Sequence, residues 1–192
     1  MNEIFFRVDE RLVHGQILFK WLEHASCSKL YIIDDQVATD PILQGVLTMT
    51  VPESVEVFFY STDEGAEAVM IADANVLVLL RTLDTLWRIY EKGTEIKTVN
   101  ICRLPFAPGK KKLYENIYVS GHEEEIIKSL TEDGTVLYIQ MVPDNEAVYL
   151  RDLIYQQRGK LYENKNNTVN TWRLGRRIIT ICSDGCRKNR ML

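Results

Sequence analysis

The chain has 192 residues, of which 46% are hydrophobic and 26% charged, a composition typical of a globular protein with one sizeable core. It has no run of about 18 apolar residues, and acidic side chains in its opening MNEIFFRVDE stand where a secretory signal needs positive charge. These features argue against a membrane-spanning or secreted protein and predict a cytoplasmic one.

Charge is unevenly distributed along the chain. Residues 158–192 contain nine Lys and Arg against two Asp and Glu, a net charge of +7, whereas residues 1–157 carry −11. Such a shift often marks a boundary, so we expect a main domain at 1–157 and a basic C-terminal extension at 158–192. An acidic main domain is poorly suited to a phosphate backbone, and we expect no nucleic-acid partner.

Apolar, β-prone segments alternate with helix-like segments throughout the main domain. The expected strands cover 4–8, 29–34, 55–60, 75–80, 96–101 and 135–141. Near-continuous apolar runs are typical of strands that are covered on both faces. The alternation predicts an α/β fold, an open, doubly wound, mainly parallel sheet of about six strands with helices on both faces.

Helix boundaries are marked between these strands. Asp40 is followed by a proline, as at an N-cap, and Ser61 and Ser120 each stand three residues before a glutamate, the spacing of a capping box. Gly93 and Gly134 follow helical segments and precede strands, as helix C-caps do.

Two further segments lack a clear element. Residues 102–116 (CRLPFAPGKKKLYEN) form either a solvated loop or, since they leave the carboxyl end of a strand, a loop that helps to shape a ligand site. Residues 172–182 are open to interpretation as a short strand, a hydrophobic tether or a disordered extension. Cys182 and Cys186 lack the usual spacing of zinc and redox motifs, and we expect neither a metal ion nor a cofactor.

Polar side chains gather where the first strand meets the first helix, in RVDERLVHGQ at residues 7–16. The apolar pattern resumes so that the helix should begin near residue 13 or 14, which places His14 at its N-terminus. Unpaired backbone N–H groups and the helix dipole favour a phosphate there and disfavour a charged imidazole. Neutral His14 is therefore a candidate nucleophile for a phosphoryl group.

The neighbours of His14 suit the same chemistry. Arg11 offers a bidentate fork to phosphate oxygens, and Asp9 either holds Arg11 in place or accepts the ring N–H of His14. Gly15 leaves room for a bulky phosphoryl group, and Gln16 can add a neutral hydrogen bond from the first helical turn.

Arg7 and the other two histidines are the remaining candidates for a chemical role. We assign Arg7, which the first strand delivers to the same edge, to phosphate binding together with Gly15 and Gln16. His24 and His122 are expected at the surface, without a chemical role.

The segment RVDERLVHGQI resembles the signature of the mannose/fructose/sorbose-class enzyme IIB of the phosphoenolpyruvate-dependent sugar phosphotransferase system. IIDDQVATDP, VLVLLRTLDTLWRIYEKGTEIKTVNI and MVPDNEAVYL extend the similarity over residues 1–152. The resemblance implies an open, mainly parallel α/β sheet and a phosphotransferase in which His14 accepts a phosphoryl group from the phosphohistidine of a IIA domain. It also implies that His14 gives this group to a sugar bound by the membrane components IIC and IID. Arg11 and Asp9 match motif positions that help to bind phosphate and to orient the histidine.

The resemblance implies a cytoplasmic protein that associates peripherally with the membrane permease, and it leaves a homodimer open. Where the family usually has a glycine pair after the strand-five asparagine, this chain has Cys102 and Arg103. Those side chains either narrow the site or, through Arg103, add a phosphate contact. Residues 158–192 have no counterpart in the family.

Other functions compete with this one. Asp34 and Asp35 follow the second strand and raise the possibility of a hydrolase or metal enzyme, but the D-x-D spacing of aspartate-nucleophile phosphatases is missing and a local cap is the simpler interpretation. A histidine phosphatase would need arginine directly before the histidine. A non-transporting regulatory IIB-like phosphoprotein, which signals sugar status, is the third alternative.

Overall fold

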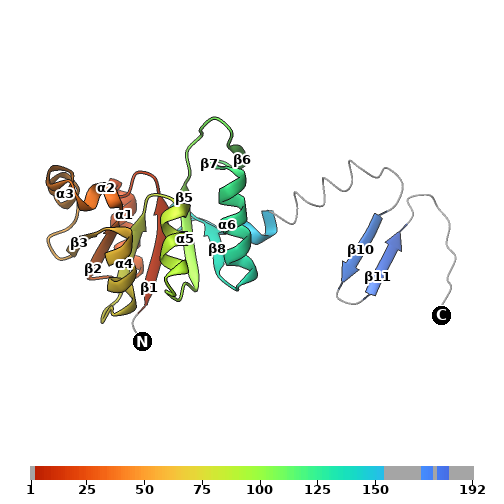
Figure 1. The fold of residues 1–192 in the computed structure, drawn as a ribbon, viewed down its shortest axis with the longest axis horizontal. Helices are drawn as coiled ribbons and strands as arrows, with labels where there is room; N and C mark the ends of the chain where they lie inside the picture. Colours follow the sequence, from red (N-terminus) through yellow and green to blue (C-terminus); the bar gives the residue numbers. More distant parts are fainter. Residues whose placement is uncertain (1–2, 154–169, 175–176, 182–192) are drawn as a thin grey trace. The chain divides into compact units, whose positions relative to one another are not determined.

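The computed structural model describes residues 3–153, 170–174 and 177–181. The chain divides into two units, Met1–Arg151 and Asp152–Leu192, each of which is described by itself. The first unit alternates strands and helices along its length (Figure 1).

Seven strands of the first unit form one sheet in the order β3-β2-β4-β1-β5-β8-β9. Their bounds are β1 Ile4–Asp9, β2 Lys29–Ile33, β3 Glu56–Tyr60, β4 Val76–Leu80, β5 Thr98–Arg103, β8 Val136–Ile139 and β9 Val148–Tyr149. Every pairing is parallel except that of β8 with β9. The expected mainly parallel sheet and its six predicted strands are confirmed, and β9 adds a short antiparallel edge that the sequence did not predict.

Helices cover both faces of this sheet, as predicted. Their bounds are α1 Gly15–His24, α2 Asp35–Ala38, α3 Pro41–Thr48, α4 Thr62–Met70, α5 Leu83–Glu91 and α6 Gly121–Glu132. The chain moves outward from β1 to β2 and β3 and then returns across the sheet to β4, β5 and β8, so right-handed crossovers place α1–α3 on one face and α4–α6 on the other (Figure 1). Side chains of α1–α3 pack with Leu30, Ile32, Leu77 and Leu79 in one buried cluster.

The predicted helix boundaries are confirmed by their hydrogen bonds. The Asp40 carboxylate caps α3, and both capping boxes, at Ser61 and Ser120, are complete. Gly93 and Gly134 have φ of +91° and +96°, the left-handed conformation that glycine adopts without strain. Local signals therefore fix where the chain enters and leaves the sheet.

The segment 102–116 is more ordered than a simple loop. It contributes β6, Lys111–Tyr114, which pairs with β7, Ile117–Val119, in an antiparallel hairpin. A parallel bridge joins Leu104 to Ile117, and both side chains are buried. The hairpin is thus anchored just beyond the end of β5.

Two strands are described in the second unit. β10, Asn170–Leu174, pairs antiparallel with β11, Arg177–Ile181, so the described part of 172–182 is strand, one of the three interpretations. The expected boundary between 157 and 158 lies outside the described residues and stays a prediction, and Cys182 and Cys186 also lie outside them. Within the described ranges, no helix is long and apolar enough to cross a membrane.

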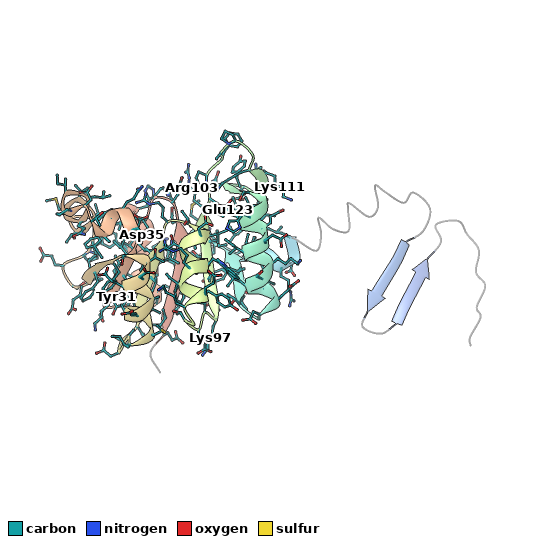
Figure 2. The ribbon with its side chains drawn as sticks, in the orientation of Figure 1. Tyr31, Asp35, Lys97, Arg103, Lys111 and Glu123 are labelled. Atoms are coloured by element: carbon teal, nitrogen blue, oxygen red, sulfur yellow. The ribbon has the colours of Figure 1, made fainter. Side chains whose placement is uncertain are left out.

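The carboxyl ends of the parallel strands share one edge of the sheet. Figure 2 shows this along β5, where Lys97, just before the strand, lies at the lower edge and Arg103, its last residue, at the upper edge. The loop from β1 to α1 leaves from this upper edge, the edge at which open parallel sheets bind ligands.

Gly65 allows α4 to approach β2 closely. A Cβ added at Gly65 would lie 2.6–2.8 Å from three side-chain atoms of Ile33, which is completely buried, whereas a Cβ added at Gly45 in α3 meets no atom within 4 Å. The two glycines are therefore a matched pair of helical positions, one crowded and one open.

We expect Gly65→Ala to lower the free energy of unfolding by about 1–3 kcal/mol, because overpacking outweighs the better helix propensity of alanine. Gly45→Ala should raise it by about 0.5–1 kcal/mol. Urea denaturation followed by circular dichroism measures both changes. Stabilisation of similar size in the two variants would contradict the close approach of α4 to β2.

Candidate functional site

His14 stands at the start of α1 with its side chain in solvent. It is the N-cap residue of the helix, its side chain makes no capping hydrogen bond, and the residue is exposed. Its predicted position at a helix N-terminus is confirmed. An exposed imidazole beside the free N–H groups of a first helical turn is accessible both to a phosphoryl group and to a partner protein.

The loop that presents His14 is tightly folded. Leu12 is buried, has φ of +56°, and donates its backbone N–H to the carbonyl of Asp9 at 2.9 Å. Gly15 has φ of +40°, and no atom lies within 4 Å of a Cβ built there. The space that Gly15 was expected to leave beside His14 is therefore open. Gln16 lies in α1, but its side chain is outside those described.

A buried carboxylate holds Arg11 in place. Asp9 accepts hydrogen bonds from Arg11 Nε at Oδ1 and from Arg11 Nη2 at Oδ2, both at 2.9 Å, and from the Arg11 backbone N–H at 3.2 Å. Burial alone would raise the pKa of Asp9, but the hydrogen bonds from Arg11 and the charge of Arg7 outweigh it and keep the pKa below its ordinary value. Of the two alternatives for Asp9, this geometry is the one in which it orients Arg11.

Arg7 lies inside the protein, under the loop. Its Nη1 donates to Asn100 Oδ1, its Nη2 donates to Asp9 Oδ2 at 3.4 Å, and both nitrogens approach the main-chain carbonyls of Gln140 and Met141 at 3.4 Å. The side chain is 3% exposed, and burial lowers its pKa although nearby anionic groups oppose the change. This arrangement places Arg7 behind Asp9, with its donors turned to the interior.

The end of β5 provides two contacts that the sequence did not predict. Cys102 is buried and its Sγ lies 3.6 Å from Arg11 Nη2, while burial raises the pKa of the thiol to about 11. Arg103 Nε lies 2.5 Å from Glu10 Oε1. Because Glu10 and Arg103 are far apart in sequence and meet only when β1 and β5 pair, no local pattern could have revealed this ion pair.

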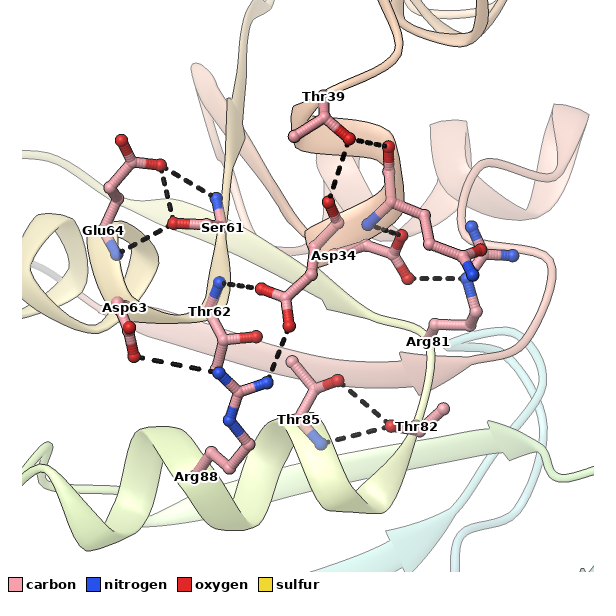
Figure 3. A network of polar contacts seen from close by, with 12 residues as sticks. Asp34, Thr39, Ser61, Thr62, Asp63, Glu64, Arg81, Thr82, Thr85 and Arg88 are labelled. Carbon is pink, nitrogen blue, oxygen red and sulfur yellow. Dashed lines mark hydrogen bonds and ion pairs between the residues drawn. The ribbon is translucent and has the colours of Figure 1, made fainter.

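Asp34 and Asp35 act locally, as the simpler interpretation proposed. Asp34 Oδ1 caps α2, and its Oδ2 accepts from Arg81 Nε at 2.6 Å. Asp35 accepts from the Thr62 backbone N–H at 2.7 Å and from Arg88 Nη1 at 2.6 Å (Figure 3). Among the described residues no group of acidic, His and Cys side chains could hold a metal ion.

The same network reaches the loop that presents His14. Arg81 Nη1 donates to the main-chain carbonyl of Glu10 at 3.4 Å, so an arginine at the end of β4 braces the loop from one side. The other two histidines have the surface positions expected for them. His24 is exposed at the end of α1, and exposed His122 pairs with Asp84 at 3.0 Å.

Comparison with known proteins agrees with this architecture. The family model described as PTS system sorbose subfamily IIB component matches residues 4–165. The expectation that residues 158–192 have no counterpart in the family is therefore wrong for residues 158–165. The chain is 26% identical over 155 residues to the N-acetylgalactosamine-specific phosphotransferase enzyme IIB component 2 of Escherichia coli, covering 80% of this chain and 99% of that protein. It is also 26% identical over 154 residues to the mannose-specific EIIAB component of Escherichia coli, covering 77% of this chain and 47% of that protein.

A solved structure shows the same fold. The IIBSor domain of the sorbose permease from Klebsiella pneumoniae superposes with a TM-score of 0.75 at 24% identity, covering 81% of this chain and 98% of that one. Since the family model spans most of the chain, the resemblance to this family is confirmed. The protein belongs to the sorbose subfamily of IIB components of the sugar phosphotransferase system, and it is a phosphotransferase.

Proposed function

We propose that His14 is the phosphoryl carrier of this IIB component, that it accepts the group from the phosphohistidine of a IIA domain, and that it passes the group to a sugar bound by the membrane components IIC and IID. The observation that carries the proposal is the placement of an exposed histidine at a helix N-terminus, three residues after an arginine held by a buried carboxylate. The mannose-specific relative is named EIIAB, which supports a IIA domain as the partner.

The transfer step exchanges one nitrogen–phosphorus bond for another. A ring nitrogen of neutral His14 attacks phosphorus with its lone pair while the bond to the donor imidazole breaks, and the donor nitrogen keeps the bonding pair. Charge on the three phosphoryl oxygens is met by the N–H groups of the first turn of α1 and by Arg11, whose Nη1 is not engaged by Asp9. Asp9 orients Arg11, and Gly15 leaves the space into which the donor fits.

The second transfer runs the same chemistry toward a sugar hydroxyl. The hydroxyl oxygen attacks phosphorus, the bond to His14 breaks, and the hydroxyl proton leaves to a base in the membrane partner or to water. Both partners must reach His14 in turn, which fits its exposed position. We infer a cytoplasmic protein that meets its permease at the membrane surface, and the homodimer stays a prediction that light scattering of the full chain would measure.

Labelling with phosphoenolpyruvate, enzyme I, HPr and the IIA of the same transporter should place one acid-labile, base-stable phosphoryl group on the wild-type chain. His14→Ala should lose this label completely because the accepting nitrogen is gone. His24→Ala and His122→Ala, which remove the other two histidines, should be labelled as the wild type is. The label is counted after separation of the proteins at alkaline pH.

Two results would contradict parts of this proposal. Labelling of His14→Ala at the wild-type level would exclude His14 as the acceptor. A labelled wild type that transfers nothing to any sugar with membranes containing IIC and IID would favour the regulatory phosphoprotein instead.

Arg11→Ala should slow transfer from IIA by about 10²–10³-fold, the usual effect of removing one donor that meets developing charge. The transfer rate of Arg11→Lys should fall between those of the wild type and Arg11→Ala, since lysine keeps the charge and loses the planar fork. Rapid-quench measurement with labelled IIA gives the rates, and circular dichroism verifies the fold. A folded Arg11→Ala variant with the wild-type rate would remove Arg11 from the mechanism.

A further inference from the structure

The end of β5 places an arginine against the loop that carries His14. Arg103 Nε lies 2.5 Å from Glu10 Oε1, and the two side chains are 44% and 26% exposed. The position is fixed by the sheet, because Arg103 is the β5 partner of Asp9 in β1 and accepts the backbone N–H of Glu10 at its carbonyl, at 3.4 Å. Arg103 therefore lies at the edge from which the loop departs (Figure 2).

Glu10 contacts Arg103 through one ion pair at Nε, whereas Asp9 binds Arg11 through two side-chain hydrogen bonds. Asp9 engages the Nε side of Arg11 and leaves its Nη1 unengaged, and Glu10 engages Nε of Arg103. Nη1 and Nη2 of Arg103 donate to no group in the described part of the chain. Two consecutive carboxylates thus each hold one guanidinium by its Nε and leave terminal N–H donors for another acceptor.

Arg11 and Arg103 both lie at the end of β5, Arg11 by contact with Cys102 and Arg103 as the last residue of the strand. Arg11 Nη2 lies 3.6 Å from the Sγ of Cys102, and Arg103 is the next residue along the strand. Arg11 lies in the loop after β1 and Arg103 is the last residue of β5, so the two arginines come from distant parts of the chain and meet at the end of β5. Arg11 belongs to the loop at 10–14 that presents His14, and Arg103 contacts Glu10 of the same loop.

We propose that Arg103 is a second phosphoryl-binding residue and that Glu10 is the positioning residue that holds it. The proposal rests on His14 as the phosphoryl carrier. Arg11 binds the oxygens of the incoming group from one side, and the terminal nitrogens of Arg103 bind from the side of β5 while its Nε stays on Glu10.

The charge balance at the site favours this assignment. A phosphoryl group brings about two negative charges and three strong acceptor oxygens. Arg11 shares its charge with Asp9, and an unpaired Glu10 four residues before His14 would repel the group. At this edge Arg81 and Arg88 are already bound to Asp34 and Asp35. Arg103, with two terminal nitrogens unengaged, supplies the second cation that the group needs.

The test uses the full-length chain and measures two quantities, the rate at which it is phosphorylated and the pKa of its phosphoryl group. Transfer rates from IIA are measured by rapid quench, and the pKa of the phosphoryl group is measured by ³¹P NMR titration, a readout that a purely structural role of Arg103 would not change. Arg103→Ala should slow transfer about 10–100-fold, as expected for lost hydrogen bonds to a charged group, and should raise the phosphoryl pKa. Arg103→Lys should recover part of both effects.

Variants of Glu10 separate positioning from simple charge cancellation. Glu10→Ala should slow transfer, and Glu10→Gln should stay closer to the wild type because its side-chain carbonyl oxygen can still contact Arg103 Nε. The double variant Glu10→Ala/Arg103→Ala should be no slower than Arg103→Ala, because Glu10 acts through Arg103. Arg88→Ala is the matched control: Arg88 is 47% exposed and paired at 2.6 Å with Asp35 beyond β2, and its loss should leave the rate unchanged.

Three results would overturn the proposal. The first is an Arg103→Ala variant that matches Arg88→Ala in transfer rate and phosphoryl pKa. The second is a Glu10→Ala variant that transfers faster than the wild type, and the third is a double variant that returns to the wild-type rate. Either of these last two results would show that Glu10 and Arg103 only cancel each other's charge. A wild-type chain that takes no label on His14 would refute the proposed function itself. A labelled wild type with an unchanged Arg103→Ala variant would refute this inference alone.

Discussion

A carboxylate buried at the end of the central strand determines how this site is built. Asp9 is 1% exposed, and an ionised carboxylate in that position is costly unless charged donors surround it. Arg7 and Arg11 supply these donors from either side along the chain. The Asp9 carboxylate also accepts the backbone N–H of Arg11, so it fixes the first turn of the loop as well as binding the two arginine side chains. The direction in which the chain reaches His14 follows from that turn.

The position of β1 between β4 and β5 gives this loop two supports. From β4, Arg81 donates to the carbonyl of Glu10 and is itself held by Asp34. From β5, Arg103 binds the side chain of the same glutamate. If His14 presents a phosphoryl group to two partners in turn, as we propose, the loop cannot be covered by other parts of the protein. It is instead held by contacts from β4 and β5 and by the buried Asp9. Preorganisation by the scaffold then takes the place of burial.

Most of the fold could be predicted because its signals are local. Strand runs, the proline after Asp40 and the capping boxes each depend on residues a few positions apart, and they are found where the sequence indicates them. The same is true of His14, whose place at a helix start follows from the apolar pattern of α1. The short β9 has no such signal, since two residues become a strand only by pairing with β8.

The roles of the individual arginines could not be read from the sequence, because they depend on contacts between strands. Arg7 stands in the motif with a charge suited to phosphate, yet Asn100 from β5 and carbonyls after β8 occupy its donors. The spacing of Arg7, Asp9 and Arg11 by two residues was the available hint, since alternate residues of a strand face the same side. That hint indicates a cluster, but it does not say which member is buried.

The exposed fraction of its side chain determines what each of the three arginines around the loop can bind. The side chain of Arg7 is 3% exposed, that of Arg11 is 24% exposed and that of Arg103 is 44% exposed. A fully enclosed guanidinium stabilises the buried carboxylate and other interior acceptors, and a half-buried one can bind the carboxylate and still present a donor outward. An exposed one that is held by a single nitrogen keeps most of its donors for a ligand. The motif at residues 7–16 contains the first two, and the third is contributed by β5, a strand far along the chain.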